Sequence, residues 1–178
     1  MSKFVNYNSV ECQVLKQAFE KMPMMDAYIA NIVEEYIYAT VRETDEEGNI
    51  IEYRTKYGEK DGEYKMWFPN GELSMETTYV EGKMQGVCNE FFDDGRLAIQ
   101  SYYKDDKLHG EFKEWLIVID TDKHYLSKQT TYIDGKLHGE YKFWGCDGLL
   151  SKHSFYKNGR IIKQKKYEDG KLQQIETY

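Results

Sequence analysis

The sequence predicts a mainly β protein, an elongated single-layer antiparallel sheet of tandem β-hairpin repeats with a short α-helical N-terminal cap. One observation is a glycine that recurs with steps of 24, 24 and 29 residues, at Gly62, Gly86, Gly110 and Gly139. Another is a set of turn signals such as Asp134-Gly135 beside alternating side chains, the strongest short-range sign of a hairpin. A third is that aromatic side chains keep a constant place in the period, which is typical of a repeat protein.

The residues between the glycines fall into columns. The columns are Tyr79, Tyr103, Tyr132 and Tyr156; Leu73, Leu97, Leu126 and Leu150; and Trp67, Phe91, Trp115 and Trp144. A fifth unit begins at Asn158-Gly159. We therefore divide the chain into residues 1–43, a helical cap with the first strand, and residues 44–178, about five repeats of about 24 residues.

Each repeat is predicted to form two short strands and two tight turns. A lone hairpin is marginal in water, so the repeats must stack edge to edge and bury aromatic rings on their neighbours. The turn glycines supply positive φ. Gly62 and its equivalents stand at strand starts instead, where we expect them to leave room for an aromatic ring over the backbone.

The first 43 residues carry helical signals before the first strand. Ser9 can cap a helix that runs to about Met22 and ends at Pro23, and a second helix is expected over 27–35. Residues 36–43 alternate like a strand, 45–49 form the first turn, and 50–57 return. Helices that cover the open edge of the first strand are the favoured interpretation, and a methionine-rich segment for partner binding or dimerisation is the alternative.

The third repeat is longer than the others. Residues 115–119 are the most apolar run of the predicted sheet, and 120–124 are expected to form a polar loop. Inserted loops often carry binding in repeat arrays, but a tolerated insertion is an equally good explanation.

The repeats resemble the MORN repeat family in its variant form. Residues 134–144 read Asp-Gly-Lys-Leu-His-Gly-Glu-Tyr-Lys-Phe-Trp, and 107–115 read Lys-Leu-His-Gly-Glu-Phe-Lys-Glu-Trp. The resemblance runs from about Glu47 to the end of the chain, with departures at 87–89, in the long third repeat and at 163–165. It implies an elongated single-layer antiparallel sheet, a role in protein association, and no catalytic chemistry in the repeats. Members of this family include antitoxin-like partner proteins, proteins of large DNA viruses and lipid-binding proteins.

Charge narrows the range of partners. The net charge of −7 and the pI of about 5.2 argue against nucleic acid and against electrostatic docking on anionic lipid. Only residues 160–171 are locally basic, and protection of a sheet edge is favoured there over a phosphate or lipid patch.

The chemistry-bearing side chains suggest neither metal binding nor catalysis. Cys12, Cys88 and Cys146 are widely spaced and form no Cys-x-x-Cys pair, which indicates reduced thiols in an intracellular, cytoplasmic setting, with a virion as the alternative. No signal peptide and no apolar run of membrane-spanning length is evident. We predict no enzyme, no catalytic residue, no cofactor and no metal.

Two recurring polar patterns have structural interpretations. His109 and His138 share a repeat position with Asp61 and Gln85, which argues against a catalytic role. Glutamates recur beside lysines and are expected to form cross-strand charge ladders. These residues are Glu63, Glu111 and Glu140, with Lys65, Lys113 and Lys142.

The aromatic columns are the candidate partner-binding residues. Strand alternation predicts Tyr64, Phe112 and Tyr141 on one face and Trp67, Phe91, Trp115 and Trp144 on the other. One column packs along the sheet and the other is partly open to a partner. The function expected is a non-enzymatic interaction or scaffold module with a protein partner. The alternatives are a self-assembling structural component, such as a homo-oligomer or viral protein, an antitoxin-like partner, or, least favoured, a lipid-binding protein.

Overall fold

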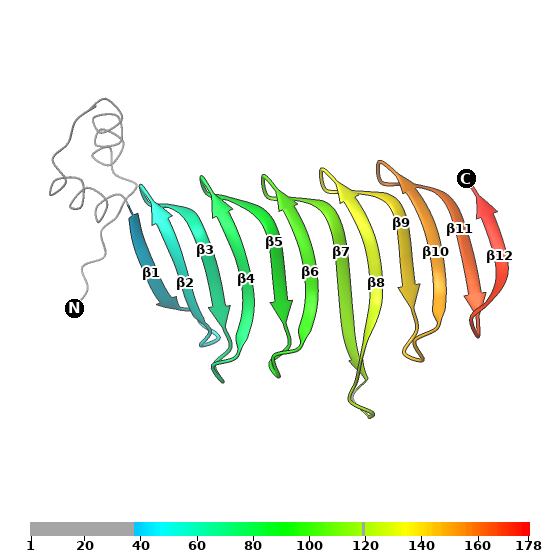
Figure 1. Ribbon diagram of the computed structural model, residues 1–178, viewed down its shortest axis with the longest axis horizontal. Helices are drawn as coiled ribbons and strands as arrows, with labels where there is room; N and C mark the ends of the chain where they lie inside the picture. Colours follow the sequence, from blue (N-terminus) through cyan, green and yellow to red (C-terminus); the bar gives the residue numbers. More distant parts are fainter. Residues whose placement is uncertain (1–37, 119) are drawn as a thin grey trace, which may run out of the picture.

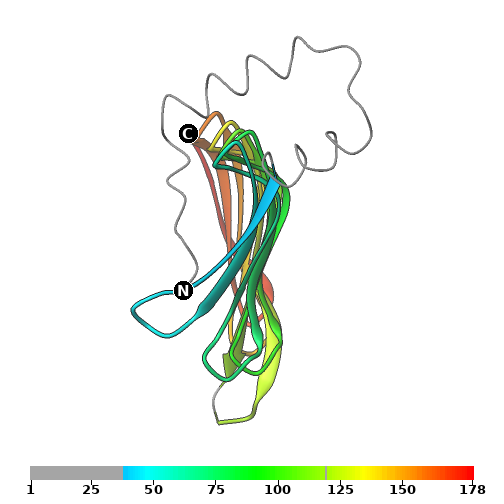
Figure 2. The ribbon, with the colours of Figure 1, turned by 90° about the vertical axis from the view of Figure 1, so that its left-hand side faces the viewer.

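The computed structural model describes residues 38–118 and 120–178. They form a single sheet of twelve antiparallel strands whose order in space is their order in the sequence (Figure 1). The strands are β1 (Tyr38–Thr44), β2 (Ile50–Lys56), β3 (Glu59–Trp67), β4 (Leu73–Val80), β5 (Lys83–Phe91), β6 (Leu97–Lys104), β7 (Lys107–Val118), β8 (Lys123–Ile133), β9 (Lys136–Trp144), β10 (Leu150–Lys157), β11 (Arg160–Glu168) and β12 (Lys171–Thr177). Seen from the β1 end, the sheet is one curved layer (Figure 2).

This architecture confirms the predicted single-layer antiparallel sheet. The described residues contain no helix, and the two predicted helices lie outside them. The predicted first strand is present as β1, and the predicted loop 120–124 is shorter, because Lys123 and His124 already belong to β8. None of the residues described in the structure forms a helix with the length and hydropathy of a membrane span.

Two kinds of turn join the strands. The turns after β2, β4, β6, β8 and β10 have two central residues with positive φ, such as Asp134 at +48° and Gly135 at +76°, which is the type I′ hairpin geometry. The turns after β1, β3, β5 and β9 have glycine in the left-handed region at their end, such as Gly71 at +90°. The predicted turn signals therefore mark true turns.

A two-residue bulge interrupts the start of β3, β5, β7 and β9. Between β4 and β5, for example, Thr77 alone faces the three residues 86–88, because Glu76 pairs with Asn89 and Thr78 with Gln85. Gly86 has φ +82° and is the first residue of this bulge, and Gly62, Gly110 and Gly139 lie in the middle of the bulges 61–63, 109–111 and 138–140 with φ between +82° and +116°. The extra carbonyl is bonded, since the Thr77 hydroxyl donates to the Val87 oxygen at 3.2 Å.

The bulge corrects the expected role of three of these four glycines. A Cβ on Gly86 or Gly139 would meet nothing within 4 Å, so no aromatic ring lies over them. An added Cβ on Gly62 would meet the Arg54 side chain at 3.4 Å, and one on Gly110 would meet Cβ and the ring Cγ of Tyr102 at 3.2 and 3.6 Å. The expected room for an aromatic side chain is therefore found at Gly110 and not at the other three glycines. Glycine is needed because the bulge requires positive φ, a conformation that side-chain-bearing residues rarely adopt.

Successive repeats are joined at the turns as well as through the strands. In the turns after β4, β6, β8 and β10, the amide of the second turn residue donates to a carbonyl in the preceding repeat. The bonds are Gly82 to Lys60 (2.8 Å), Asp106 to Met84 (3.2 Å), Gly135 to Leu108 (2.8 Å) and Gly159 to Leu137 (2.8 Å). The donors and acceptors recur with the repeat, so each repeat is fixed against its neighbour in the same way.

Candidate functional site

The register assigns the aromatic columns to opposite faces of the sheet. In β3, residues 64–67 pair one by one with Tyr53, Glu52, Ile51 and Ile50, so Tyr64 and Trp67 point to opposite sides. The two-residue bulge preserves this alternation, because an even insertion does not exchange the faces. We call the side of Tyr64 the core face and the side of Trp67 the outer face.

The core face holds most of the side chains that are buried. A row of paired residues crosses the sheet through Cys88, Ser101, Phe112, Thr130, Tyr141, Ser154 and Gln164. Small residues in this row are almost inaccessible, with Ser101 1% and Ser154 0% exposed. Large rings lie between them and pair with tyrosines of the next column, as Phe112 does with Tyr132 at a centroid distance of 5.8 Å.

Two of the candidate residues, Phe112 and Tyr141, therefore belong to this packed row, and Tyr64 pairs with Thr77 on the same face. Burial raises the pKa of the Tyr64 and Tyr141 hydroxyls. The Lys60 ammonium lies 4.5 Å from the centroid of Tyr64 and 5.0 Å from that of Tyr79, and burial lowers its pKa. This column therefore stabilises the sheet, with cation–π contacts over its rings.

The other four candidates form the outer-face feature that we call the aromatic strip. Each ring pairs with a leucine of the following strand, and none is fully buried. The members of the strip are Trp67 with Leu73, Phe91 with Leu97, Trp115 with Leu126, and Trp144 with Leu150. Aromatic and leucine side chains thus alternate in one row from β3 to β10, next to the turns that end the odd-numbered strands.

The strip is reinforced at its centre by the long third hairpin. His124 lies beyond Trp115 in the extension of β7 and β8, and its ring stacks on Trp115 with centroids 6.4 Å apart. It also meets Phe92 edge-on at 6.3 Å, and its Nε2 lies 2.8 Å from the Leu97 carbonyl oxygen. The inserted segment therefore contacts the strip instead of standing apart from it.

A polar row borders the strip on the outer face. It crosses the sheet through directly paired residues from β1 to β11. The polar row is Arg42, Glu52, Lys65, Glu76, Asn89, Gln100, Lys113, Gln129, Lys142, His153 and Lys165.

The expected cross-strand pairing of glutamates with lysines is wrong in its direction. Lys113 Nζ lies 2.7 Å from Oε2 of Glu111, and Lys142 lies 2.6 Å from Glu140, both within a single strand. Residues i and i+2 share a face, so a lysine reaches the glutamate of its own strand as readily as one across the ladder. The lysine partner holds the pKa of the Glu111 and Glu140 carboxyls below the usual range.

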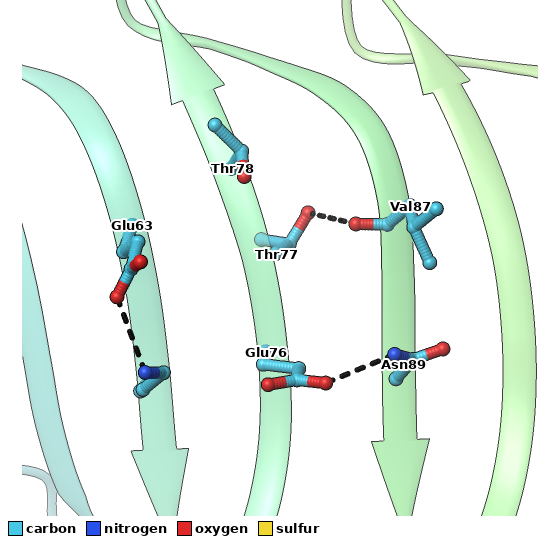
Figure 3. A pocket seen from close by; sticks show the side chains of 7 residues that line it. Glu63, Glu76, Thr77, Thr78, Val87 and Asn89 are labelled. Carbon is cyan, nitrogen blue, oxygen red and sulfur yellow. Dashed lines mark hydrogen bonds and ion pairs between the residues drawn. The ribbon is translucent and has the colours of Figure 1, made fainter.

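A shallow hollow opens on the outer face above β3, β4 and β5 (Figure 3). Its volume is about 240 Å³. The lining residues are Glu63, Lys65, Glu76, Thr77, Thr78, Val87 and Asn89. Asn89 donates to Glu76 at 3.0 Å and Lys65 to Glu63 at 3.1 Å, so the polar groups of the hollow are largely paired with one another. This arrangement offers no acid–base pair in two contrasting environments.

The histidines of the described residues act within the sheet. His109 Nδ1 lies 3.2 Å from Asp134 Oδ1 in the turn of the next repeat. At the equivalent position of the first repeat, the Asp61 carboxylate accepts from the Glu81 amide. His153 is 13% exposed, and burial lowers its pKa. Among residues 38–118 and 120–178, no three His, Cys, Asp or Glu side chains are grouped as a metal site would require.

The turns beside the strip form an acidic edge. The six turns at this end of the sheet follow β1, β3, β5, β7, β9 and β11. Counted together with the one strand residue on each side of every turn, they carry eleven acidic side chains and three basic ones, Arg96, Lys123 and Lys171. The acidic residues are Asp45, Glu46, Glu47, Glu72, Asp93, Asp94, Asp120, Asp122, Asp147, Glu168 and Asp169. The turns at the opposite end, taken in the same way, carry five acidic and seven basic side chains.

Sequence reasoning did not identify the leucines of the strip or the acidic edge. The leucine column was visible, but only the register shows that each leucine lies beside an aromatic ring. The sequence predicts turns such as 45–49 and the loop 120–124, but only the strand order shows that these turns lie at one end of the sheet.

Of the comparisons with known proteins, the one with a family model supports the repeat. No curated protein matches the chain significantly. Solved structures of TarM share 13% identity with it at a TM-score of 0.34, one of them being an S. aureus TarM mutant in complex with Fondaparinux, alpha-GlcNAc-glycerol and UDP. These alignments cover 83% and 84% of this chain, which spans about a quarter of the TarM chains, at 25% and 26%. The family model described as MORN repeat variant matches residues 60–81 and 161–178, in agreement with the resemblance of the repeats to that family.

Proposed function

We propose that this chain is a non-enzymatic protein–protein interaction module whose contact surface is the aromatic strip. The observation that carries the proposal is the row of Trp67, Phe91, Trp115 and Trp144 on the face opposite the packed core row. The core face already stabilises the sheet by burying small residues and stacking rings, so the strip is available for a partner. Half-open tryptophan and phenylalanine rings give a large contact area at a small entropic cost.

A comparison of point variants tests this proposal. Trp115→Ala and Trp144→Ala remove strip rings, and Leu116→Ala is the matched control, because Leu116 is 40% exposed on the core face beside Trp115. Affinity purification with each folded variant, with circular dichroism as the check on folding, should lose the same partner protein in both tryptophan variants and keep it in the control. Equal recovery of that partner in all three variants would reject the strip as the contact surface.

Self-association is a second candidate function. Strand β12 pairs only with β11 among the described residues, and two of its apolar side chains, Leu172 at 48% and Ile175 at 52%, are exposed. An open strand with such side chains can pair with another chain. Light scattering at rising concentration tests this: a constant monomer mass excludes it, and a larger mass that Ile175→Lys abolishes supports it.

A further inference from the structure

We propose that the partner segment on the aromatic strip is a basic amphipathic α-helix lying across the strands; this inference rests on the proposed function above. Three features of the outer face lead to it: the spacing of the strip, its length, and the charge of the edge beside it.

The spacing of the strip fits a helix better than an extended chain. Neighbouring strands lie about 4.8 Å apart, so the strip presents an apolar side chain about every 4.8 Å and an aromatic ring about every 9.6 Å. A helix rises about 1.5 Å per residue, so a heptad repeats after about 10.5 Å and its two apolar positions recur on average every 5.3 Å. An extended peptide presents side chains on one face about every 6.7 Å, which matches neither interval.

The length of the strip sets the length of the helix. From Trp67 in β3 to Trp144 in β9 the row crosses six strand spacings, about 29 Å. A helix covers this distance with about 20 residues, or three heptads. Over that distance the two periods drift apart by about 3 Å, less than half the width of an aromatic side chain, so the contacts stay in register along the whole strip.

The charge of the helix follows from the acidic edge. The four turns directly next to the strip, after β3, β5, β7 and β9, carry six acidic residues and two basic ones, and Arg96 is paired with Asp94 and Asp122. The polar row on the other side of the strip carries both signs of charge and is paired through contacts such as Lys113 with Glu111. A helix on the strip therefore places one flank over acidic turns and the other over a nearly neutral surface. Lysine or arginine on the first flank complements the turns, and acidic residues there would be repelled.

A display experiment with the full chain tests this inference. The probe is a library of 25-residue peptides with leucine at both apolar heptad positions and a random choice of Lys, Glu or Gln elsewhere, mixed with a library of random linear peptides. We expect enrichment of heptad peptides with an excess of lysine on one flank. Their binding should fall at least tenfold in Trp115→Ala and Trp144→Ala, stay within twofold in Leu116→Ala, and weaken as salt rises.

Other outcomes overturn the inference. Enrichment of linear or acidic peptides, no enrichment of either library, or binding unaffected by both tryptophan variants would each reject the basic helix. If the tryptophan variants no longer bind the natural partner but no basic helix is selected, the strip remains an interaction surface and only the proposal of a basic helix is rejected. If the tryptophan variants also bind the natural partner as well as the unmodified chain does, both proposals are rejected.

Discussion

The bulge glycines permit a direct test of why the repeat contains them. Gly139 has φ +82° and open space around it, so Gly139→Ala adds no steric conflict and changes only the backbone preference. Holding alanine in a left-handed conformation costs about 1–2 kcal/mol, and the smaller entropy of the unfolded chain returns about 0.5 kcal/mol. We expect a net loss of about 1 kcal/mol in the free energy of unfolding.

Gly110 gives the contrasting case. Its φ is +116°, outside the left-handed basin that alanine can reach, and an added Cβ would lie 3.2 Å from Cβ of Tyr102. Gly110→Ala should therefore cost about 2–3 kcal/mol. Gly139→Asn should cost less than Gly139→Ala, because asparagine tolerates the left-handed region.

Urea unfolding followed by tryptophan fluorescence and far-UV circular dichroism measures these differences. A loss of 1 kcal/mol corresponds to a thermal midpoint lower by about 2–4 °C for a chain of this size. If Gly139→Ala leaves the unfolding midpoint unchanged, positive φ is not required at this position. If Gly139→Ala and Gly110→Ala lose the same free energy of unfolding, the contact with Tyr102 adds no steric cost at Gly110.

Three further predictions concern single side chains. Thr130→Val should lower the free energy of unfolding by about 1–2 kcal/mol, because the buried Thr130 hydroxyl donates to the Glu140 carbonyl at 3.1 Å. Urea titration measures this loss beside Thr130→Ser, which keeps the hydroxyl and should lose less; no loss in either variant would contradict the prediction. Burial lowers the pKa of His153, so the unfolded chain binds more protons and stability falls as pH drops below about 6.5; His153→Gln should flatten this slope between pH 7 and 5, and an identical slope in both proteins contradicts it. Burial raises the pKa of the Cys88 thiol to about 11, so a disulfide reagent at pH 8 should modify exposed Cys146 rapidly and Cys88 only after unfolding; equally fast reaction at both would be incompatible with the packed core row.

Much of the fold could be predicted because the repeat contains many residues with strong local conformational preferences. Pairs such as Asp134-Gly135 specify turns by themselves, and columns such as Tyr79 with Tyr103 reveal the period without any knowledge of the register. The opposite faces of Tyr64 and Trp67 were also predictable by alternation, because both residues lie beyond the bulge of β3, where residues 64–67 pair one by one.

The remainder depends on which residues become neighbours across strands. The bulge at Gly86 cannot be distinguished from a straight strand start until Thr78 is seen to pair with Gln85. The register places Gln100 and Gln129 opposite Lys113, so its ion pair is with Glu111 of its own strand. The sequence predicts the aromatic rings of the strip but not its leucines, because the register alone determines which residues are adjacent across strands.

Each strand of this sheet bonds only to the strands before and after it in the chain, from β1 to β12. No pairing waits for a distant segment, so loop-closure entropy stays small for every hairpin, and such low contact order favours rapid folding. During synthesis, each new hairpin can dock on the hairpin that left the ribosome just before it. The same arrangement makes the number of hairpins adjustable: a whole repeat can be duplicated or lost without rerouting the rest of the chain.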